Sequence, residues 1–479
     1  MTDARWQSPL GTRYASPAMQ ALWGEPHRIG LWRRLWLALM ETQRELGLDI
    51  PAAAVDALRG HLDDADLGAA AQYERRFRHD VMAHIHALGD QAPAARPYLH
   101  LGATSAYVTD NADLIVIRDG LRLLLGRLVA LLRALGRFAE RRAGLPCLAY
   151  THFQPAQLTT VGKRATLWAQ DFGLDAEELC RRIETLRFLG CKGTTGTQAS
   201  FLELFRGDHE KVRELDRRIA ARMGFASPFS VAGQTYPRKT DSAVLDVLSG
   251  LAQSASKLAA DLRLLQHEGE LLEPFEPEQI GSSAMAYKRN PMRAERIAGL
   301  ARFVIALSQN AAQTAATQWL ERTLDDSANR RLVLPEAFLA GDAILILATN
   351  IAAGLEVREP VIARHVAEQM PFMASERWLM LGVAAGGDRQ ALHEVIRTTS
   401  LAVAAEVSGG APNDLMDRLA RHPAFRQVGA GALAAELDPE RYTGRAEPQV
   451  GEFLREFLEP VLRRAATLAA PAAMEEVKV

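Results

Sequence analysis

The longest regular pattern of apolar and polar residues lies between residues 114 and 138. Its apolar positions follow one another at alternating steps of three and four: Leu114, Ile117, Leu121, Leu124, Leu128, Leu131, Leu135 and Phe138. This spacing places them on one face of an α-helix for more than three heptads. Ile115, Leu125 and Leu132 are also apolar, so we expect the helix to bury more than one face. At 1.5 Å per residue it would be roughly 40 Å long.

Four further segments have long helical patterns, at residues 155–189, 240–268, 291–319 and 328–355. Five helices of this length form a bundle with more apolar faces than one chain can cover. We therefore expect the bundles of several subunits to assemble into one helical core. Pro335 lies inside the last pattern, where its missing N–H should kink the helix.

The segments on either side of the bundle are shorter. Residues 1–30 are rich in Pro, Gly and Ser, which favours an extended arm, whereas residues 30–46 and 66–88 have helical spacing. After Val357 the helical patterns shorten and Gly and Pro return. No segment shows strong β alternation.

Together these patterns predict an all-α protein with three helical domains. They are an N-terminal domain at residues 1–104, a central long five-helix bundle at residues 105–357, and a C-terminal domain at residues 358–479. The chain has 479 residues, 48% of them hydrophobic, and this length is sufficient for about three domains around a large core.

Charge and cysteine content exclude several classes of protein. The formal net charge is -2 and the basic residues are spread along the chain, which argues against a nucleic-acid or membrane-surface partner. The three cysteines are too few for a disulfide framework and lack Cys-x-x-Cys spacing. The longest uncharged apolar stretch, residues 343–355, is too short to span a bilayer, and no leader pattern opens the chain. We expect a cytoplasmic location.

Residues 281–291 read Gly-Ser-Ser-Ala-Met-Ala-Tyr-Lys-Arg-Asn-Pro, which predicts a flexible loop running into a helix. Asn290 is a natural N-cap and Pro291 a natural first helical residue. Backbone N–H groups before such a helix, together with Lys288, would hold an anion or a developing oxyanion. A bare Gly-Ser-Ser is more often a linker, but the Met, Lys, Asn and Pro at fixed places favour a functional loop.

Histidines provide candidate acids and a weak candidate metal site. His152 lies in Tyr-Thr-His-Phe-Gln-Pro, residues 150–155, and we expect Pro155 to begin a helix, which places His152 near a helix N-terminus and favours its neutral form. Alone, such a histidine is more often structural. His84 and His86 lie two apart and would point to different sides of a helix, which is poor geometry for a metal.

Arginines gather after the loop, at Arg289, Arg293 and Arg296, and again at Arg322, Arg330 and Arg331. A dicarboxylic substrate does not require so many guanidinium groups, whereas a phosphate in addition would use them bidentately. The alternative is a set of surface arginines paired with Asp325, Asp326 and Glu295.

The loop at 281–291 resembles the signature loop of the fumarase/aspartase superfamily, helical lyases that release fumarate, and the Thr-His-x-Gln-Pro segment resembles the one that supplies their general acid. Further motifs follow in the order found in the adenylosuccinate lyase family. They are Arg13-Tyr14, Arg78-His79-Asp80, Thr104-Ser105, residues 233–236 (Gly-Gln-Thr-Tyr) and the second arginine segment.

The resemblance implies roles for individual residues. Ser282 would be the general base and His152 the general acid, with Ser283 left open as the base. A free serine is a weak base, so the loop must close over substrate and stabilise an alkoxide with Lys288 and backbone amides. Lys288 and Asn290 would hold the carboxylate that takes up the carbanion's charge. The other implied substrate-binding residues are Arg13, Tyr14, Arg78, His79, Asp80, Thr104, Ser105, Gln234, Arg296, Arg322, Ser327 and Arg331.

The resemblance also implies an activity: release of fumarate from adenylosuccinate, giving AMP, and from the succinylated aminoimidazole-carboxamide ribotide (SAICAR), giving AICAR. It implies no metal or organic cofactor, and a homotetramer whose sites are shared among three subunits. Argininosuccinate lyase or another fumarate-releasing relative is the nearest alternative. A catalytically inactive helical scaffold is the alternative from another class, and the intact Ser282, Lys288 and His152 argue against it. One departure is Ala286, where many relatives carry proline.

Overall fold

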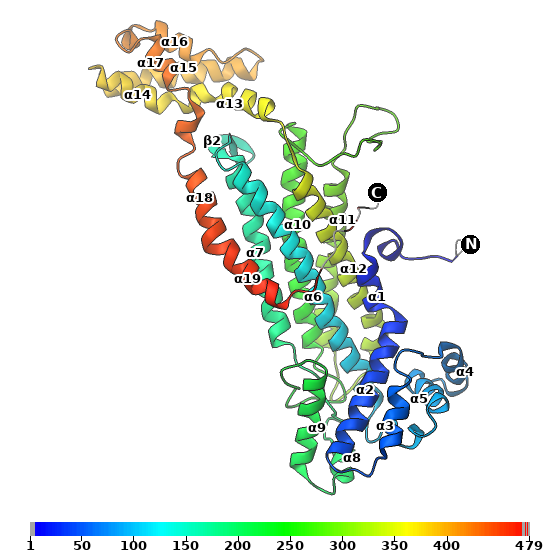
Figure 1. Ribbon diagram of the computed structural model, residues 1–479. Coiled ribbons are helices and arrows are strands. Elements are labelled where there is room, and N and C mark those ends of the chain that lie inside the picture. The colour runs from blue at the N-terminus through cyan, green and yellow to red at the C-terminus, as the bar shows by residue number, and fades with distance from the viewer. Residues whose placement is uncertain (1–4, 472–474, 476, 478–479) are drawn as a thin grey trace.

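The computed structural model describes residues 5–471, 475 and 477. Five long helices of the described chain run up and down beside one another (Figure 1). They are α6 (Ser105–Arg141), α7 (Val161–Thr185), α10 (Lys239–His267), α11 (Met292–Ala316) and α12 (Asp325–Gly354). The predicted all-α class and the long five-helix bundle are confirmed.

Helix α6 is longer than the pattern predicted. It has 37 residues, so it spans about 56 Å. The eight predicted seam residues are all buried, and so are Ile115, Leu125 and Leu132, which confirms that the helix buries more than one face. Helix α12 is continuous through Pro335. By length and composition it is, among the described residues, the helix that could cross a membrane, but 72% of its apolar window is buried inside the structure.

A β-hairpin separates α6 from α7, which corrects the predicted helix start at Pro155. Strands β1 (Pro146–Thr151) and β2 (Gln154–Thr160) pair antiparallel, with Tyr150 opposite Pro155. Helix α7 begins at Val161, after Thr160 accepts a capping hydrogen bond from the Lys163 N–H at 3.1 Å. Threonine is the better cap, and the hairpin occupies the residues before it. His152 therefore lies in a turn and not near a helix N-terminus.

The expected extended arm at residues 1–30 is also wrong for its described part. After a π-helical turn (Leu10–Tyr14), α1 (Pro17–Trp23) and α2 (Glu25–Glu45) follow. Ser16 caps α1 by accepting from the Met19 N–H at 3.2 Å, and Pro17 stands at the first helical position. The Ser16 N–H donates to the buried Asp342 carboxylate at 2.7 Å, so this segment is tied to α12.

The predicted helix at 66–88 is two helices, α4 (Leu67–Phe77) and α5 (Asp80–Gln91). Arg78 ends α4 in the left-handed conformation, with φ 56°. His79 then caps α5, accepting from the Met82 N–H at 3.3 Å. Elements nearby are α3 (Ala52–Arg59), a 3₁₀ turn (Arg96–Tyr98), α8 (Ala199–Leu204) and α9 (His209–Arg222).

Strands β3 (Leu271–Leu272) and β4 (Glu356–Val357) pair at the end of the bundle where α10 and α12 end. The C-terminal region begins after β4. Its first helices are α13 (Glu359–Met373), α14 (Ser375–Ala384), α15 (Arg389–Ser408), α16 (Leu415–Arg421) and α17 (Ala430–Ala435). Helices α14–α17 surround a core of their own that includes Trp378 and Phe425. In contrast, α18 (Ala446–Phe453) and α19 (Glu459–Leu468) return to pack on α7 and α6. The domain limits at residues 104 and 357 stay a prediction.

Candidate functional site

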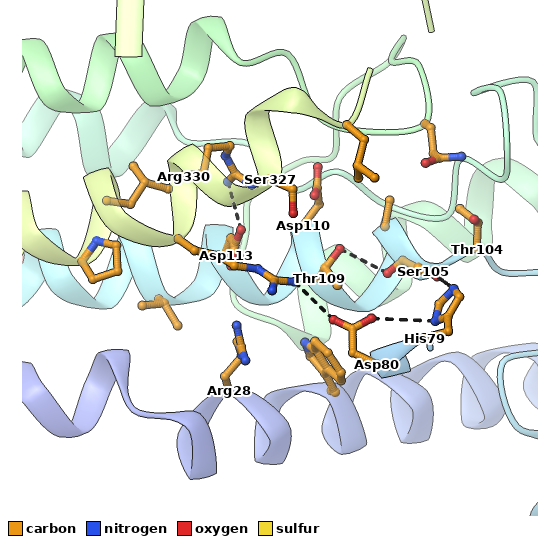
Figure 2. A pocket seen from close by; sticks show the side chains of 18 of the residues that line it. Arg28, His79, Asp80, Thr104, Ser105, Thr109, Asp110, Asp113, Ser327 and Arg330 are labelled. Atoms are coloured by element: carbon orange, nitrogen blue, oxygen red, sulfur yellow. Dashed lines mark hydrogen bonds and ion pairs between the residues drawn. The ribbon is translucent and has the colours of Figure 1, made fainter. Parts of the chain in front are cut away.

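A cavity of about 760 Å³ opens where α6 and α12 begin, between these helices, α2 and the break between α4 and α5. Figure 2 shows the His79, Asp80, Thr104, Ser105 and Ser327 side chains gathered there. Nine of the predicted substrate-binding residues line it: Arg78, His79, Asp80, Thr104, Ser105, Gln234, Arg322, Ser327 and Arg331. The fold thus brings together residues from four separate segments of the chain.

The break between α4 and α5 is connected to both long helices. His79 Nε2 lies 3.4 Å from Ser105 Oγ, at the start of α6. Arg331 Nη2, on α12, donates to Asp80 Oδ2 at 3.3 Å. Thr104 holds the N-cap position of α6 but makes no capping hydrogen bond with its side chain. Its hydroxyl is therefore not used by the helix, unlike the usual threonine cap.

Buried charged residues orient the side chain of Arg322. Its Nη1 donates to both oxygens of Asp326, at 2.9 and 3.1 Å. Asp326 is buried and also accepts from Arg238 Nε at 2.5 Å, and Arg238 in turn donates to both oxygens of Asp110, at 2.9 and 3.2 Å. Burial disfavours the charge of Arg238, but Asp110 together with Tyr236 and Asp241 outweighs burial, and the pKa of Arg238 is raised. The pairing of Arg322 with Asp326 was part of the surface alternative, yet the aspartate is buried and the arginine faces the cavity.

A second buried group adjoins the first. Arg330 donates to Asp241 Oδ2 at 2.7 Å and contacts Asp113 Oδ2 at 2.9 Å and the Tyr236 hydroxyl. Burial raises the pKa of Asp113, with Arg330 opposing the effect. Sequence reasoning missed Asp110, Asp113, Arg238 and Asp241. For Asp110 and Asp113, the available signal was a charged residue inside the long apolar helix α6.

Gln234 reaches the cavity because Gly196 and Gly233 let three loops, at residues 196, 232–233 and 321, approach one another closely. A Cβ on Gly196 would lie 2.0 Å from the Ala232 carbonyl oxygen, and one on Gly233 would lie 2.4 Å from the Glu321 carbonyl oxygen. Neither position has room for a side chain. The Gln234 amide nitrogen then donates to the Thr194 carbonyl at 3.0 Å, which fixes its direction.

Tyr14 and Arg296 form a separate pair, and Arg13 precedes Tyr14 in the same turn. The guanidinium carbon of Arg296 lies 5.1 Å from the centre of the Tyr14 ring, a cation–π contact between the turn before α1 and the first turns of α11. Neither these residues nor the loop at 281–291 line the cavity in this chain.

The loop at 281–291 stands out from the other end of the bundle (Figure 1). Ser282 Oγ accepts from the N–H groups of Ala284 and Met285, at 3.3 and 3.1 Å. Ser283 and Lys288 are exposed. Asn290 is not the predicted N-cap: α11 begins at Met292, and the Asn290 amide instead donates to the Gly281 carbonyl at 2.8 Å, which closes the loop.

His152 lies exposed at the hairpin tip, where it and Phe153 both have positive φ, 51° and 58°. The hairpin follows the end of α6, whereas the cavity lies at its start. About 56 Å of helix therefore separates His152 from Ser105. His84 and His86 pack on aromatic rings, and no group of three or more potential metal ligands occurs among the described residues.

Comparisons with known proteins add independent findings. A family model described as lyase matches residues 48–306, and one described as adenylosuccinate lyase C-terminus matches residues 371–453. The chain is 47% identical over 462 residues to adenylosuccinate lyase of Saccharomyces cerevisiae, covering 96% of each chain. It is 46% identical over 460 residues to that of Schistosoma mansoni, covering 95% of this chain and 96% of the relative.

Solved structures show the same fold at low identity. A 3-carboxy-cis,cis-muconate lactonizing enzyme from Pseudomonas putida has a TM-score of 0.80 and 24% identity, covering 96% of this chain and 99% of its own. A fumarate lyase from Mesorhizobium sp. BNC1 has a TM-score of 0.76 and 23% identity, covering 94% and 98%. The long-bundle architecture is thus shared with these proteins.

Proposed function

Because the chain belongs to the adenylosuccinate lyase family and is thus a lyase of the fumarase/aspartase superfamily, we propose that it cleaves adenylosuccinate to AMP and fumarate. We further propose the analogous cleavage of SAICAR to AICAR and fumarate. Both reactions belong to purine nucleotide biosynthesis, and the proposed location is the cytoplasm.

The observation that carries the proposal is the convergence of nine predicted substrate-binding residues on one cavity. Arg322 and Arg331 supply guanidinium groups there, and Ser327 supplies a hydroxyl, which suits a phosphate. Among the described residues, the side chain of Arg322 donates to Asp326 through Nη1, so its Nη2 group is available for an anion.

The proposed chemistry is a β-elimination on the succinyl group. Ser282, as the alkoxide, removes a proton from the methylene carbon, and the electron pair moves into the adjacent carboxylate, which Lys288 and Asn290 stabilise. The C–N bond then breaks, the new C=C bond forms fumarate, and His152 gives a proton to the departing nitrogen. Closure of the loop excludes water and supplies the cations that stabilise the alkoxide.

We propose that the enzyme is a homotetramer whose sites each combine three groups from three subunits. The three groups are the cavity, the signature loop with Tyr14 and Arg296, and the hairpin with His152. Figure 1 shows α4 and α5, whose break borders the cavity, toward one end of the bundle, and the hairpin and the loop at 281–291 toward the other. Antiparallel packing of neighbouring subunits brings opposite ends together.

An ultraviolet assay tests the function directly. The protein should cleave adenylosuccinate and SAICAR with a change in absorbance, and should cleave dephosphorylated succinyl-adenosine far less well. Cleavage of argininosuccinate without cleavage of adenylosuccinate would overturn the proposal. Equal cleavage of adenylosuccinate and succinyl-adenosine would retain the reaction but remove the phosphate site.

A further inference from the structure

A buried ionic group at the base of the hairpin has no role in the chemistry described above. Glu270 is fully buried where α10 ends and β3 begins. Its Oε1 lies 2.9 Å from Nδ1 of His365, on α13. Its Oε2 faces Nη1 of Arg164, in the first turns of α7, at 4.0 Å. One carboxylate therefore joins the bundle to the first helix of the C-terminal region.

Arg164 extends this group to the hairpin. Its Nη2 donates a hydrogen bond to the carbonyl oxygen of Leu148, on β1. The pairing of β1 with β2 shifts register between Leu148 and Tyr150, so the strand ladder is irregular at this point. Arg164 thus supports the hairpin where strand pairing gives it least support, four residues before His152.

Arg164 and Glu270 lie among neutral groups, so each charge depends on the other for its compensation. Burial raises the pKa of the Cys147 thiol to about 11, and burial followed by the Glu270 charge raises the pKa of Tyr150 to about 12. These neighbours stay neutral at physiological pH. Within the described part of the chain, neither Arg164 Nη1 nor Glu270 Oε2 has a hydrogen-bond partner. A buried charge without a partner is strongly unfavourable, so the attraction across 4.0 Å keeps the guanidinium directed at Glu270.

We propose that Glu270 is a positioning residue for His152. Its carboxylate fixes the guanidinium of Arg164, and Arg164 fixes the hairpin through the Leu148 carbonyl. The inference rests on the proposed function, because it takes His152 as the general acid. Glu270 and Arg164 act only through the hairpin: neither lines the substrate cavity.

Kinetics with adenylosuccinate test the chain of contacts. Glu270→Gln and Arg164→Met should each lower kcat by on the order of 10- to 100-fold, as expected when an acid is displaced by about 1 Å, and should leave KM within about twofold. The double variant should be no worse than either single variant, because both act on one contact. His365→Gln is the matched control: it changes the other partner of Glu270 and keeps Glu270, Arg164 and the bond of Arg164 to the Leu148 carbonyl, so kcat should be unchanged.

Two further measurements separate positioning from general loss of structure. In a His152→Ala background, Glu270→Gln should cause no additional loss of the residual turnover. Hydrogen exchange of the amides at residues 147–153 should become faster in Glu270→Gln and Arg164→Met but not in His365→Gln. If Glu270→Gln does not fold, Arg164→Lys, which keeps the charge but loses the forked geometry, takes its place in each comparison.

Unchanged kcat in Glu270→Gln, or a further loss in the His152→Ala background, would overturn the inference while the proposed function stands. Failure of the unmodified enzyme to cleave adenylosuccinate would instead overturn the proposed function. Exchange at residues 147–153 that is equal in all variants would also show that Glu270 does not hold the hairpin.

Discussion

Ser282 is half-buried in a loop whose other side chains are mostly exposed, so its hydroxyl adds little to the core. Ser282→Ala should therefore fold normally and lose turnover by about 10² to 10⁴, the usual contribution of a general base. Ser283→Ala, one residue along the same exposed loop, is the matched control and should retain activity. Near-normal turnover in Ser282→Ala, with loss in Ser283→Ala, would move the base to Ser283.

Arg322 faces the cavity with its direction set by the buried Asp326. Arg322→Ala should raise KM for adenylosuccinate by about 10- to 150-fold, because a charge-assisted contact to phosphate contributes roughly 1.5 to 3 kcal/mol. The same variant should leave inhibition by fumarate unchanged. Arg331→Ala should behave similarly. A loss of fumarate inhibition equal to the loss of substrate affinity would mean that these arginines bind the succinyl group instead.

His100 lies in the turn that leads to Thr104 and Ser105, and its Nδ1 accepts from the Trp36 indole N–H at 3.0 Å. Accepting requires the neutral ring, and burial, with a smaller effect of His79, lowers the pKa of His100 to about 4. The unfolded chain takes up this proton near pH 6.5. This contribution to stability is therefore complete above about pH 6.5 and is lost as the pH falls toward 4.

His100→Gln should keep an acceptor for Trp36 but remove the titration. Unfolding measured at pH 7 and pH 5 should show a smaller difference in the variant, by on the order of 1 to 2 kcal/mol. Equal differences in the two proteins would contradict the assigned protonation state.

At the level of elements, the long helices could be predicted and the short elements between them could not. The seam on α6 is an unbroken period that only a helix satisfies, so its burial follows from the sequence. The hairpin turn at His152 and Phe153 requires positive φ from two residues that rarely adopt it. Pro155 fits the start of a helix equally well, and only tertiary contacts such as that of Arg164 with Leu148 decide between the two.

The candidate site divides in the same way. Residues such as Arg78 and Arg322 were predicted from motif resemblance, and the fold brings them to one cavity. The buried partners Asp110 and Arg238 were missed, because their pairing joins positions 128 apart in the chain. Nothing local in a sequence reports such a contact.

The two ends of the signature loop lie close together only because residue 281 is glycine. A Cβ at this position would lie 2.0 Å from the Lys288 carbonyl oxygen, so Gly281→Ala must open the base of the loop. We expect turnover to fall at least about tenfold with little change in unfolding temperature. Gly431→Ala, in α17, where an added Cβ meets nothing within 4 Å, is the control and should leave turnover unchanged. Full activity in Gly281→Ala would show that the loop is not closed through this contact during catalysis.

For the molecule as a whole, the proposed sharing of each site among three subunits predicts complementation. His152→Ala and Ser282→Ala chains should each have little activity alone. Dissociated together and reassembled in equal amounts, they should regain activity in roughly a quarter of the sites if the two residues of a site come from different subunits. The recovery is measured by adenylosuccinate cleavage, with mixed tetramers confirmed by mass. No recovery in mixed tetramers would place both residues of a site on one chain.

About 56 Å of α6 separates the cavity from the hairpin in one chain, and the proposed sharing of each site between subunits has a genetic consequence. If every site takes its hairpin from one chain and its loop from another, a chain with a lesion in either the hairpin or the loop inactivates one site. This holds for every combination of neighbouring chains. In a cell with equal doses of normal and singly altered chains, half of the sites remain active, so the altered chains do not inactivate the sites built from normal parts. With a normal allele and an allele altered in both the hairpin and the loop, about a quarter of the sites remain active. The same two lesions on separate alleles also leave about a quarter, so the distribution of the lesions between the alleles does not change the active fraction.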